Sequence, residues 1–272
     1  MTFDSLVTIA TSNWSDAVAV MVDGLATHAP KLAHKLVVYR DAPMACEAWC
    51  IERDERVLFR PLDELTAPEW PWPGPEPDQQ PTELDLLCLY KWALLAQAPG
   101  RTTLWLDADV LIRGPLDAVC DAWEPGKVLA SAAMAVDGWR YHSDNKALST
   151  GMYAYEPSEG LLNAVVAYAK SHPKPQYAAD QNAFSMYMNE VRPNDVILLI
   201  NHFHANTRAH HYAPDIWAEV DGDQAALWHF AGPKPWLTDF QRCQHGPWAQ
   251  MFNEWRKTAN GLGLGPYPLL GV

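Results

Sequence analysis

Basic residues are scarce in this sequence, and the shortage limits the partners that the protein can have. Its 272 residues include 20 Lys and Arg against 33 Asp and Glu, which gives a formal net charge of −13. A surface with this charge repels phosphate backbones, so we expect no nucleic-acid partner. A bound nucleotide is still compatible with the charge, because a metal ion can invert the local field.

Long apolar runs are also missing. No stretch approaches the roughly 20 apolar residues needed to cross a bilayer, so we expect no transmembrane segment. The opening Met1-Thr2-Phe3-Asp4 has no basic region of the kind that begins a signal peptide, and the tail at 262–272 has no basic cluster for an anionic membrane. We therefore expect a cytoplasmic protein.

Cysteines are few and do not form a framework. There are five, and only Cys46 and Cys50 lie close together in the sequence. A single Cys-x3-Cys pair is a weak signal for zinc, so reduced and partly buried thiols are the expectation.

Apolar residues, by contrast, are abundant enough for a large core, at 49% of the chain. Strands are predicted at 6–10, 35–39 and 56–59, and a helix capped by Ser12 or Ser15 is predicted at 16–28. This β-α-β order predicts an α/β fold with a mainly parallel central sheet flanked by helices. Without a repeat or a linker, we expect one domain over 1–272, with a core at about 6–240 and a C-terminal helix and tail at 241–272.

The remaining elements follow from the same patterns. Thr82 and Asp85 resemble the capping end of a helix at 82–97. The other expected helices lie at 115–123, 157–171, 180–188 and 247–257, and the other expected strands at 103–107, 128–131, 151–155, 196–200 and 227–230. A proline-rich segment at 67–81 is interpreted as a rigid surface loop, or else as a lid that offers Trp70 and Trp72 to a sugar.

Asp107-Ala108-Asp109 is the most informative segment of the chain. It follows the apolar run 103–106 and precedes the apolar run 110–112. Alternate residues of a strand share a face, so both carboxylates are expected on one side, at the carboxyl edge of the sheet. Such a pair suits a hard divalent cation, and the cation suits a diphosphate. The alternative is a pair of carboxylates that only caps the next turn.

Three other segments carry candidate functional residues. In 227–236, His229 is a possible third metal ligand, Gly232 permits close approach of a ligand, and Lys234 can place its charge on phosphate. Gly151, within a predicted strand, indicates close approach of a ligand or of backbone. Asp180 and Gln181 open a helix, either as sugar contacts or, for Asp180, as an N-cap.

A histidine cluster has two possible interpretations. It consists of His202, His204, His210 and His211. These side chains could hold a second metal, or they could belong to a flexible polar loop near an acceptor.

Together these segments resemble the retaining GT-A-fold glycosyltransferases of family 8, which include glycogenin, galactinol synthase and bacterial lipopolysaccharide galactosyl- and glucosyltransferases. The matching segments are 104–112, 149–158, 180–181 and 229–236, in the family's order. Residues 7–14 also look like the family's nucleotide-binding first strand and loop. The resemblance implies a single GT-A (Rossmann-like) domain and a hexosyltransferase that uses a UDP-sugar, with UDP-glucose or UDP-galactose as the expected donor and an acceptor that is not specified.

The resemblance also implies roles for individual residues. Asp107, Asp109 and His229 would bind Mn²⁺, or Mg²⁺ as the second choice, and the metal would bridge the diphosphate. Asp180 and Gln181 would lie near the anomeric carbon. The remaining donor contacts would come from Ala10, Thr11, Asn13 and Trp14 around the uridine, from Ala108, Gly232 and Lys234 near the phosphates, and from Lys91, which corresponds to a basic residue ahead of the metal motif.

Retention of anomeric configuration would follow from attack on the same face as the leaving group, or from a double displacement through Asp180. Two positions differ from the family pattern: only Pro233 separates Gly232 from Lys234, and Ser149 replaces an asparagine.

Two other functions are compatible with parts of the sequence. One is an Asp-x-Asp phosphatase, and the other is a nucleotide-sugar or carbohydrate-binding module without transfer activity.

Overall fold

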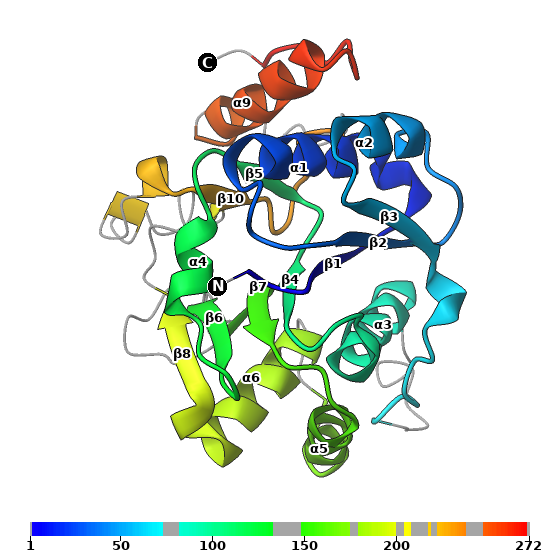
Figure 1. Cartoon of the computed structure of the whole chain (residues 1–272), viewed down its shortest axis with the longest axis vertical. Coiled ribbons are helices and arrows are strands. Elements are labelled where there is room, and N and C mark those ends of the chain that lie inside the picture. Colours follow the sequence, from blue (N-terminus) through cyan, green and yellow to red (C-terminus); the bar gives the residue numbers. More distant parts are fainter. Residues whose placement is uncertain are drawn as a thin grey trace.

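A central β-sheet organises the protein (Figure 1). The computed structural model describes residues 2–72, 82–132, 148–174, 179–199, 204–207, 217–218, 222–237 and 247–270. Within these residues, seven strands form one sheet in the order β3-β2-β1-β4-β7-β6-β8. Their bounds are β1 Ser5–Ala10, β2 Leu36–Arg40, β3 Val57–Pro61, β4 Thr103–Leu106, β6 Val128–Ala132, β7 Leu148–Tyr155 and β8 Val196–Leu199.

The sheet is mainly parallel, as the sequence predicted. Strands β3, β2, β1 and β4 pair in parallel, as do β6 and β8, and only β7 runs antiparallel to its two neighbours. A second sheet of three short strands, in the described part of the chain, has the order β5-β10-β9. Its strands are β5 Val110–Ile112, β9 His204–Asn206 and β10 Leu227–His229.

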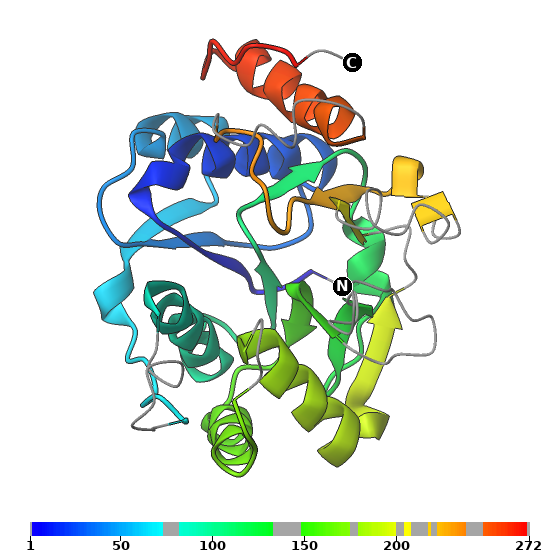
Figure 2. The same ribbon diagram turned by 180° about the vertical axis from the view of Figure 1, so that it is seen from behind.

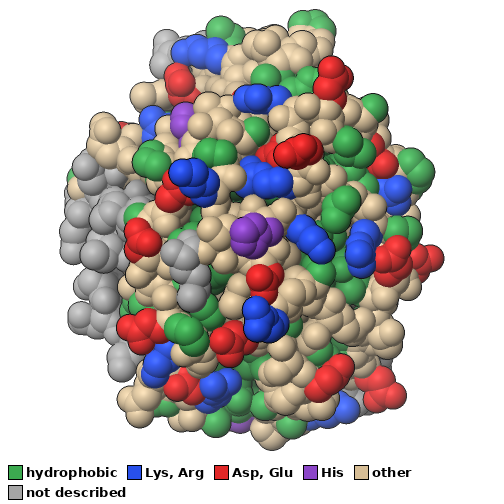
Figure 3. Space-filling view, in the orientation of Figure 1, with side chains coloured by type: hydrophobic (Ala, Val, Ile, Leu, Met, Phe, Trp, Pro, Cys, Tyr) green, Lys and Arg blue, Asp and Glu red, His purple; other side chains and the backbone are tan. Residues whose placement is uncertain are grey.

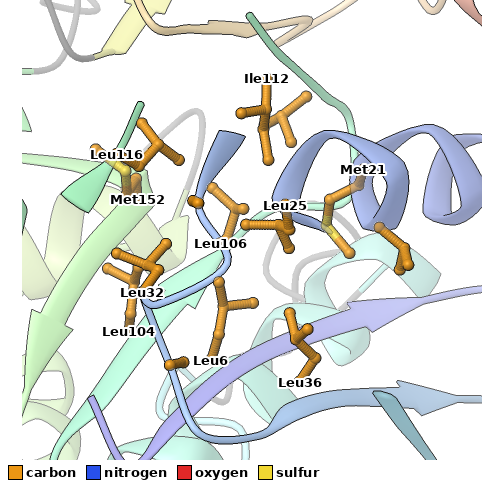
Figure 4. Close-up of a cluster of buried hydrophobic side chains, with 14 of the residues drawn as sticks. Leu6, Met21, Leu25, Leu32, Leu36, Leu104, Leu106, Ile112, Leu116 and Met152 are labelled. Carbon is orange, nitrogen blue, oxygen red and sulfur yellow. The ribbon is translucent and has the colours of Figure 1, made fainter. Parts of the chain in front are cut away.

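Side-chain alternation along the strands creates two cores, one on each face of the large sheet. In β2, Leu36 and Val38 enter one core, and Val37 and Tyr39 enter the other. The first core packs beneath α1 (Ser15–His28), α2 (Glu47–Arg53) and α4 (Asp117–Ala122), and Figure 4 shows part of it. The second packs against α3 (Glu83–Gln97), α5 (Glu159–Lys170) and α6 (Ala179–Val191), seen from behind in Figure 2.

Helix starts were predicted with mixed success. The capping box of α3 is confirmed, because Thr82 Oγ1 accepts from the Asp85 amide and Asp85 accepts from the Thr82 amide. The predicted caps of α1 are wrong. Residues 12–14 form a 3-10 turn, and Ser15 is the first residue of the helix. The Ser15 hydroxyl instead accepts a 2.8 Å bond from the Cys46 amide, so it joins α1 to the start of α2.

The C-terminal helix α9 (Pro247–Gly261) lies over α1 (Figure 1). Trp255 on its inner face is completely buried. Arg256 reaches two carbonyl oxygens, from Nε to Pro235 at 2.9 Å and from Nη1 to Pro268 at 2.6 Å. The helix therefore holds both the C-terminal tail and the loop that contains Pro235 against the body of the protein.

Trp72 is a core residue, which argues against the lid interpretation of the proline-rich segment. Its ring packs against Trp92 with centroids 6.0 Å apart, and its indole nitrogen donates to the His172 carbonyl at 3.0 Å. Trp70 packs edge-on against Trp72, and the Lys174 ammonium lies 5.0 Å from its ring centre. Residues 73–81 lie outside the described part of the chain.

The surface carries charges of both signs. On the face shown in Figure 3, acidic and basic side chains are interspersed and no broad patch of one sign stands out. No helix in the described ranges is both long enough and apolar enough to pass through a bilayer.

We predict that Gly24→Ala destabilises the protein, although alanine is the better helix former. A Cβ at Gly24, in α1, would lie 2.8 Å from the Ile112 Cβ in β5. Overpacking of this kind costs roughly 1–3 kcal/mol, against about 1 kcal/mol gained from helix propensity, so the free energy of unfolding should fall. Urea unfolding measures it.

The matched control is Gly261→Ala at the end of α9, where a new Cβ has no neighbour within 4 Å. This variant should be at least as stable as the wild type. If Gly24→Ala were equally stable, the packing of α1 on β5 described here would be incorrect.

Candidate active site

The two aspartates lie where the chain passes from one sheet to the other. The Asp107 amide donates to the Gly151 carbonyl at 2.8 Å, which extends the pairing of β4 with β7. The Phe230 amide donates to the Asp109 carbonyl at 2.8 Å, which extends the pairing of β5 with β10. The expectation that both carboxylates share the face of one strand is therefore wrong, because β4 ends at Leu106 and a turn carries them.

Strand β10 brings His229 to the same point. It pairs antiparallel with β5, and His229 stands opposite Val110. The imidazole Nε2 lies 3.4 Å from Asp107 Oδ2 and 3.3 Å from Asp109 Oδ1. One ligand atom from each of the three residues falls within 4.8 Å of the other two. The three residues predicted as metal ligands are thus brought together.

Two lysines balance the carboxylates. From α3, Lys91 Nζ donates to Asp107 Oδ1 at 2.9 Å, and the Trp105 indole donates to the same oxygen at 2.8 Å. On the other side, Lys234 Nζ donates to Asp109 Oδ2 and to the Phe230 carbonyl. Each aspartate therefore has its own lysine, which compensates its negative charge.

The loop after β10 turns back on itself, and this turn places Lys234. Gly232 has a φ of 117°, in a region that only glycine adopts readily. The single residue Pro233 between Gly232 and Lys234 is sufficient for the lysine to reach Asp109.

Asp109 is a buried carboxyl that stays ionised. Burial by itself would raise its pKa, but the positive charge of Lys234 and the His229 imidazole outweigh burial and hold the pKa well below its usual range. The oxygen atoms of Asp109 are therefore available as charged ligands at neutral pH.

Strand β7 and α6 form another wall of the site. Gly151 leaves room for His229, since a Cβ at this position would lie 2.4 Å from both Cε1 and Nδ1 of the imidazole. Beside it, the Thr150 amide donates to Gln181 Oε1 at 3.2 Å, which fixes the Gln181 side chain near this strand. Asp180 lies in the first turn of α6, but its side chain is outside the described atoms.

His204, on β9, packs behind His229. Their rings stack with centroids 5.3 Å apart and an interplanar angle of 24°. Burial lowers the pKa of His204 to about 3, so the ring is neutral in the usual pH range. This histidine is neither exposed nor part of a polar loop. The other members of its sequence cluster, His202, His210 and His211, lie outside the described residues.

The loop after β1 reaches the same region through Trp14. The Trp14 ring meets Trp236 edge-on at 5.3 Å, and Lys234 Nζ lies 5.3 Å from the centre of the Trp14 ring. Ala10 ends β1 and is buried, whereas Asn13 is exposed and its side-chain oxygen accepts a bond from the Thr11 hydroxyl. All four predicted nucleoside contacts therefore lie at or just beyond the carboxyl end of β1.

Two findings at this edge were not anticipated. Asp41 follows β2 and accepts bonds from the Ser12 and Ala42 amides, at 2.7 and 2.8 Å. Its position directly after a parallel strand is the signal that could have identified it. Ala108, between the two aspartates, directs its methyl group into the core, where it is almost completely buried.

Comparison with known proteins identifies the fold. No family model matches the sequence, and no curated protein does either. Among solved structures, a galactosyltransferase, LgtC, in complex with donor and acceptor sugar analogues, is similar with a TM-score of 0.63 and 15% identity over 97% of each chain. The glycosyltransferase GlyE of Streptococcus pneumoniae is similar with a TM-score of 0.62 and 12% identity, over 96% of this chain and 63% of its own.

Mouse xyloside xylosyltransferase 1 is a further similar structure, with a TM-score of 0.55 and 14% identity over 84% of this chain and 97% of its own. At these identities the likeness establishes the fold and nothing finer. The protein has the α/β GT-A fold that these glycosyltransferases share, which confirms the predicted fold class.

The three proposed ligands fit a divalent cation. Two carboxylates and one imidazole nitrogen converge on one point, and this mixture of oxygen and nitrogen donors suits Mn²⁺ or Mg²⁺. The flanking lysines add positive charge beside that point. The arrangement can bind an anionic group through the cation and stabilise charge that develops on it.

We predict that Gly151→Ala weakens Mn²⁺ binding by about tenfold or more, because displaced or misoriented ligands typically cost 10–100-fold in affinity. The new methyl group would occupy space held by the His229 ring and push the imidazole away from the carboxylates. Titration calorimetry with Mn²⁺ measures the effect.

The matched control is Gly160→Ala in α5, where the nearest atom would be 4.0 Å away. This variant should bind Mn²⁺ like the wild type. If Gly151→Ala binds Mn²⁺ with wild-type affinity, the position of the His229 ring described here does not matter for metal binding.

Proposed function

We propose that this protein is a metal-dependent retaining glycosyltransferase that moves a hexose from a UDP-sugar to an acceptor hydroxyl. UDP-glucose and UDP-galactose are the first donors to consider, and the acceptor is open to a glycan, a lipid-linked sugar, a protein or a small molecule. The observation that carries the proposal is the position of His229 Nε2, which lies within 3.4 Å of both Asp107 and Asp109 in a glycosyltransferase fold.

Mn²⁺ is the cation that we propose for this site, with Mg²⁺ as the alternative. The ligands would be carboxylate oxygens of Asp107 and Asp109 and Nε2 of His229. A bound divalent cation would supply Lewis-acid stabilisation of the diphosphate that leaves the sugar. Nε2 of His229 can serve as a ligand because it lies within 3.4 Å of a carboxylate oxygen of each aspartate.

Lys234 provides the second positive charge for the leaving group. It donates to Asp109 Oδ2, and its ammonium lies 5.3 Å from the centre of the Trp14 ring. When a diphosphate binds, the ammonium can transfer its contact to a phosphate oxygen. A close charge pair of this kind contributes on the order of 4 kcal/mol at an effective dielectric constant near 20.

The carboxyl end of β1 is the proposed nucleoside site. Parallel sheets bind ligands outside the carboxyl ends of their strands, and Ala10, Thr11 and Asn13 are at that position. Trp14 would lie beside the uracil ring, and the Lys234 ammonium is 5.3 Å from the centre of the Trp14 ring.

The transfer exchanges one bond for another at the anomeric carbon. The acceptor oxygen forms a bond to that carbon, the bond to the diphosphate oxygen breaks, and its electron pair leaves on UDP. The proton of the acceptor hydroxyl passes to the departing phosphate oxygen if attack occurs on the same face. A double displacement would use the Asp180 carboxylate as the nucleophile, and Gln181, fixed by the Thr150 amide, would then contact the sugar.

We predict that the protein releases UDP from at least one UDP-hexose in the presence of Mn²⁺, and that Asp109→Asn lowers this rate by at least about 100-fold. A loss of this size is typical when a group that stabilises developing charge is removed. The substitution removes one ligand charge and leaves Lys234 without its carboxylate. A panel of UDP- and GDP-sugars, scored for nucleotide release with Mn²⁺ or with a chelator, measures it.

The control is Asp63→Asn, which alters an exposed carboxylate in the turn after β3 and should not change the rate. Thermal unfolding would verify that both variants are folded.

If a UDP-sugar binds with Mn²⁺ but no acceptor ever yields UDP, the protein is a binding module. Release of phosphate from simple phosphomonoesters would favour the phosphatase instead.

A further inference from the structure

Two buried nitrogen atoms behind the proposed metal site have no hydrogen-bond partner among the described residues. They are Nδ1 of His229 and Nε2 of His204. Both side chains are more than nine-tenths buried, at 6% and 4% exposure. An unpaired buried nitrogen costs free energy, so two of them on neighbouring rings indicate a hydrogen bond that the two rings can share.

The two nitrogens face the same small space. A Cβ built on Gly151 would lie 2.4 Å from His229 Nδ1 and 3.4 Å from His204 Nε2. The absence of a side chain at Gly151 therefore leaves room in which these atoms can meet, directly or through one water molecule. The ring centroids are 5.3 Å apart and the ring planes differ by 24°, so the two side chains are direct neighbours at this space.

The far side of the His204 ring is fixed by a second contact. Its Nδ1 hydrogen-bonds to the Ser131 hydroxyl, which belongs to β6 and is buried. With the ring proton on Nδ1 and directed to Ser131, Nε2 carries a lone pair and can accept.

A metal-bound His229 requires an acceptor of this kind. When Nε2 of His229 coordinates a cation, the ring proton must sit on Nδ1, and ligand histidines generally donate that proton to a neighbouring group. No carboxylate or carbonyl among the described residues accepts it here.

We propose that His204 is the positioning residue for His229: its Nε2 accepts the Nδ1 proton of His229 over Gly151, and so holds the His229 ring in the tautomer and orientation that bind the cation. The proposal rests on the metal site of the proposed function. The hydrogen-bonded series runs from Ser131 through His204 to His229, and it joins β6 and β9 to the two aspartates.

Three substitutions at position 204 separate this role from packing. His204→Phe keeps a stacked ring but has no acceptor. His204→Asn can still reach Ser131, but its side chain is too short to reach the space over Gly151. His204→Gln places an amide oxygen near the position of Nε2 and restores the acceptor.

The experiment is titration calorimetry of the three variants with Mn²⁺ alone, together with thermal unfolding in the presence of a chelator. We expect His204→Phe and His204→Asn to bind Mn²⁺ about tenfold or more weakly, as is typical when the partner of a ligand histidine is lost. We expect His204→Gln to stay within about threefold of the wild type, because it keeps the acceptor. The unfolding temperature without metal should not follow this order.

The outcomes distinguish the two proposals. Wild-type Mn²⁺ affinity in His204→Phe would overturn the role of His204 and leave the metal site intact. Affinity that falls equally in all three variants, in step with their unfolding temperature, would reduce His204 to a packing residue and overturn the proposal. If the wild type itself binds no Mn²⁺, the metal site fails, and the role of His204 fails with it.

Discussion

The crossing of the chain between two sheets is the constraint on which this site depends. At Asp107 the backbone is still paired with β7 of the large sheet, and at Asp109 it is already paired with β10 of the small one. Ala108, between them, is buried in the core and anchors the turn. Because both ends of the turn are held by backbone hydrogen bonds, the two carboxylates have fixed positions, and β10 adds His229 from the opposite direction.

The charges of the site balance each other. Lys91 and Trp105 hold Asp107, and Lys234 holds Asp109. A buried Asp109 next to a half-buried Asp107 would be costly without these partners. The same balance has a functional consequence, because a cation that replaces Lys234 at Asp109 would release the ammonium toward an anion. The donor site and the metal site would thus be coupled through one side chain.

Much of the fold could be predicted from the sequence. The local geometry of turns and helix ends could be predicted less well. Alternation in 36–39 and the capping pair Thr82 and Asp85 depend on neighbours in the chain, so they could be predicted. The turn between the sheets could not, since an apolar run on both sides of Asp107 and Asp109 resembles one continuous strand. The Ser15 hydroxyl was assigned to a helix cap for a similar reason, because its partner, Cys46, is distant in sequence.

His204 shows the same limit for the functional residues. In the sequence it is one of four histidines in a polar stretch, with nothing to separate it from His202 or His210. Only the parallel pairing of β9 with β10 brings it beside His229. For Trp72 the error is the opposite one. A tryptophan among prolines resembles a surface residue that contacts a ligand, but Trp72 fills the core beside α3.

The most direct test of the account is a crystal structure with Mn²⁺ and UDP, with the metal located by its anomalous scattering. The account predicts one strong peak within bonding distance of Asp107, Asp109 and His229 Nε2, with the diphosphate on its open side and Lys234 moved from Asp109 to a phosphate oxygen. A peak elsewhere, or a diphosphate bound with Lys234 still on Asp109 and no metal between the three residues, would contradict it.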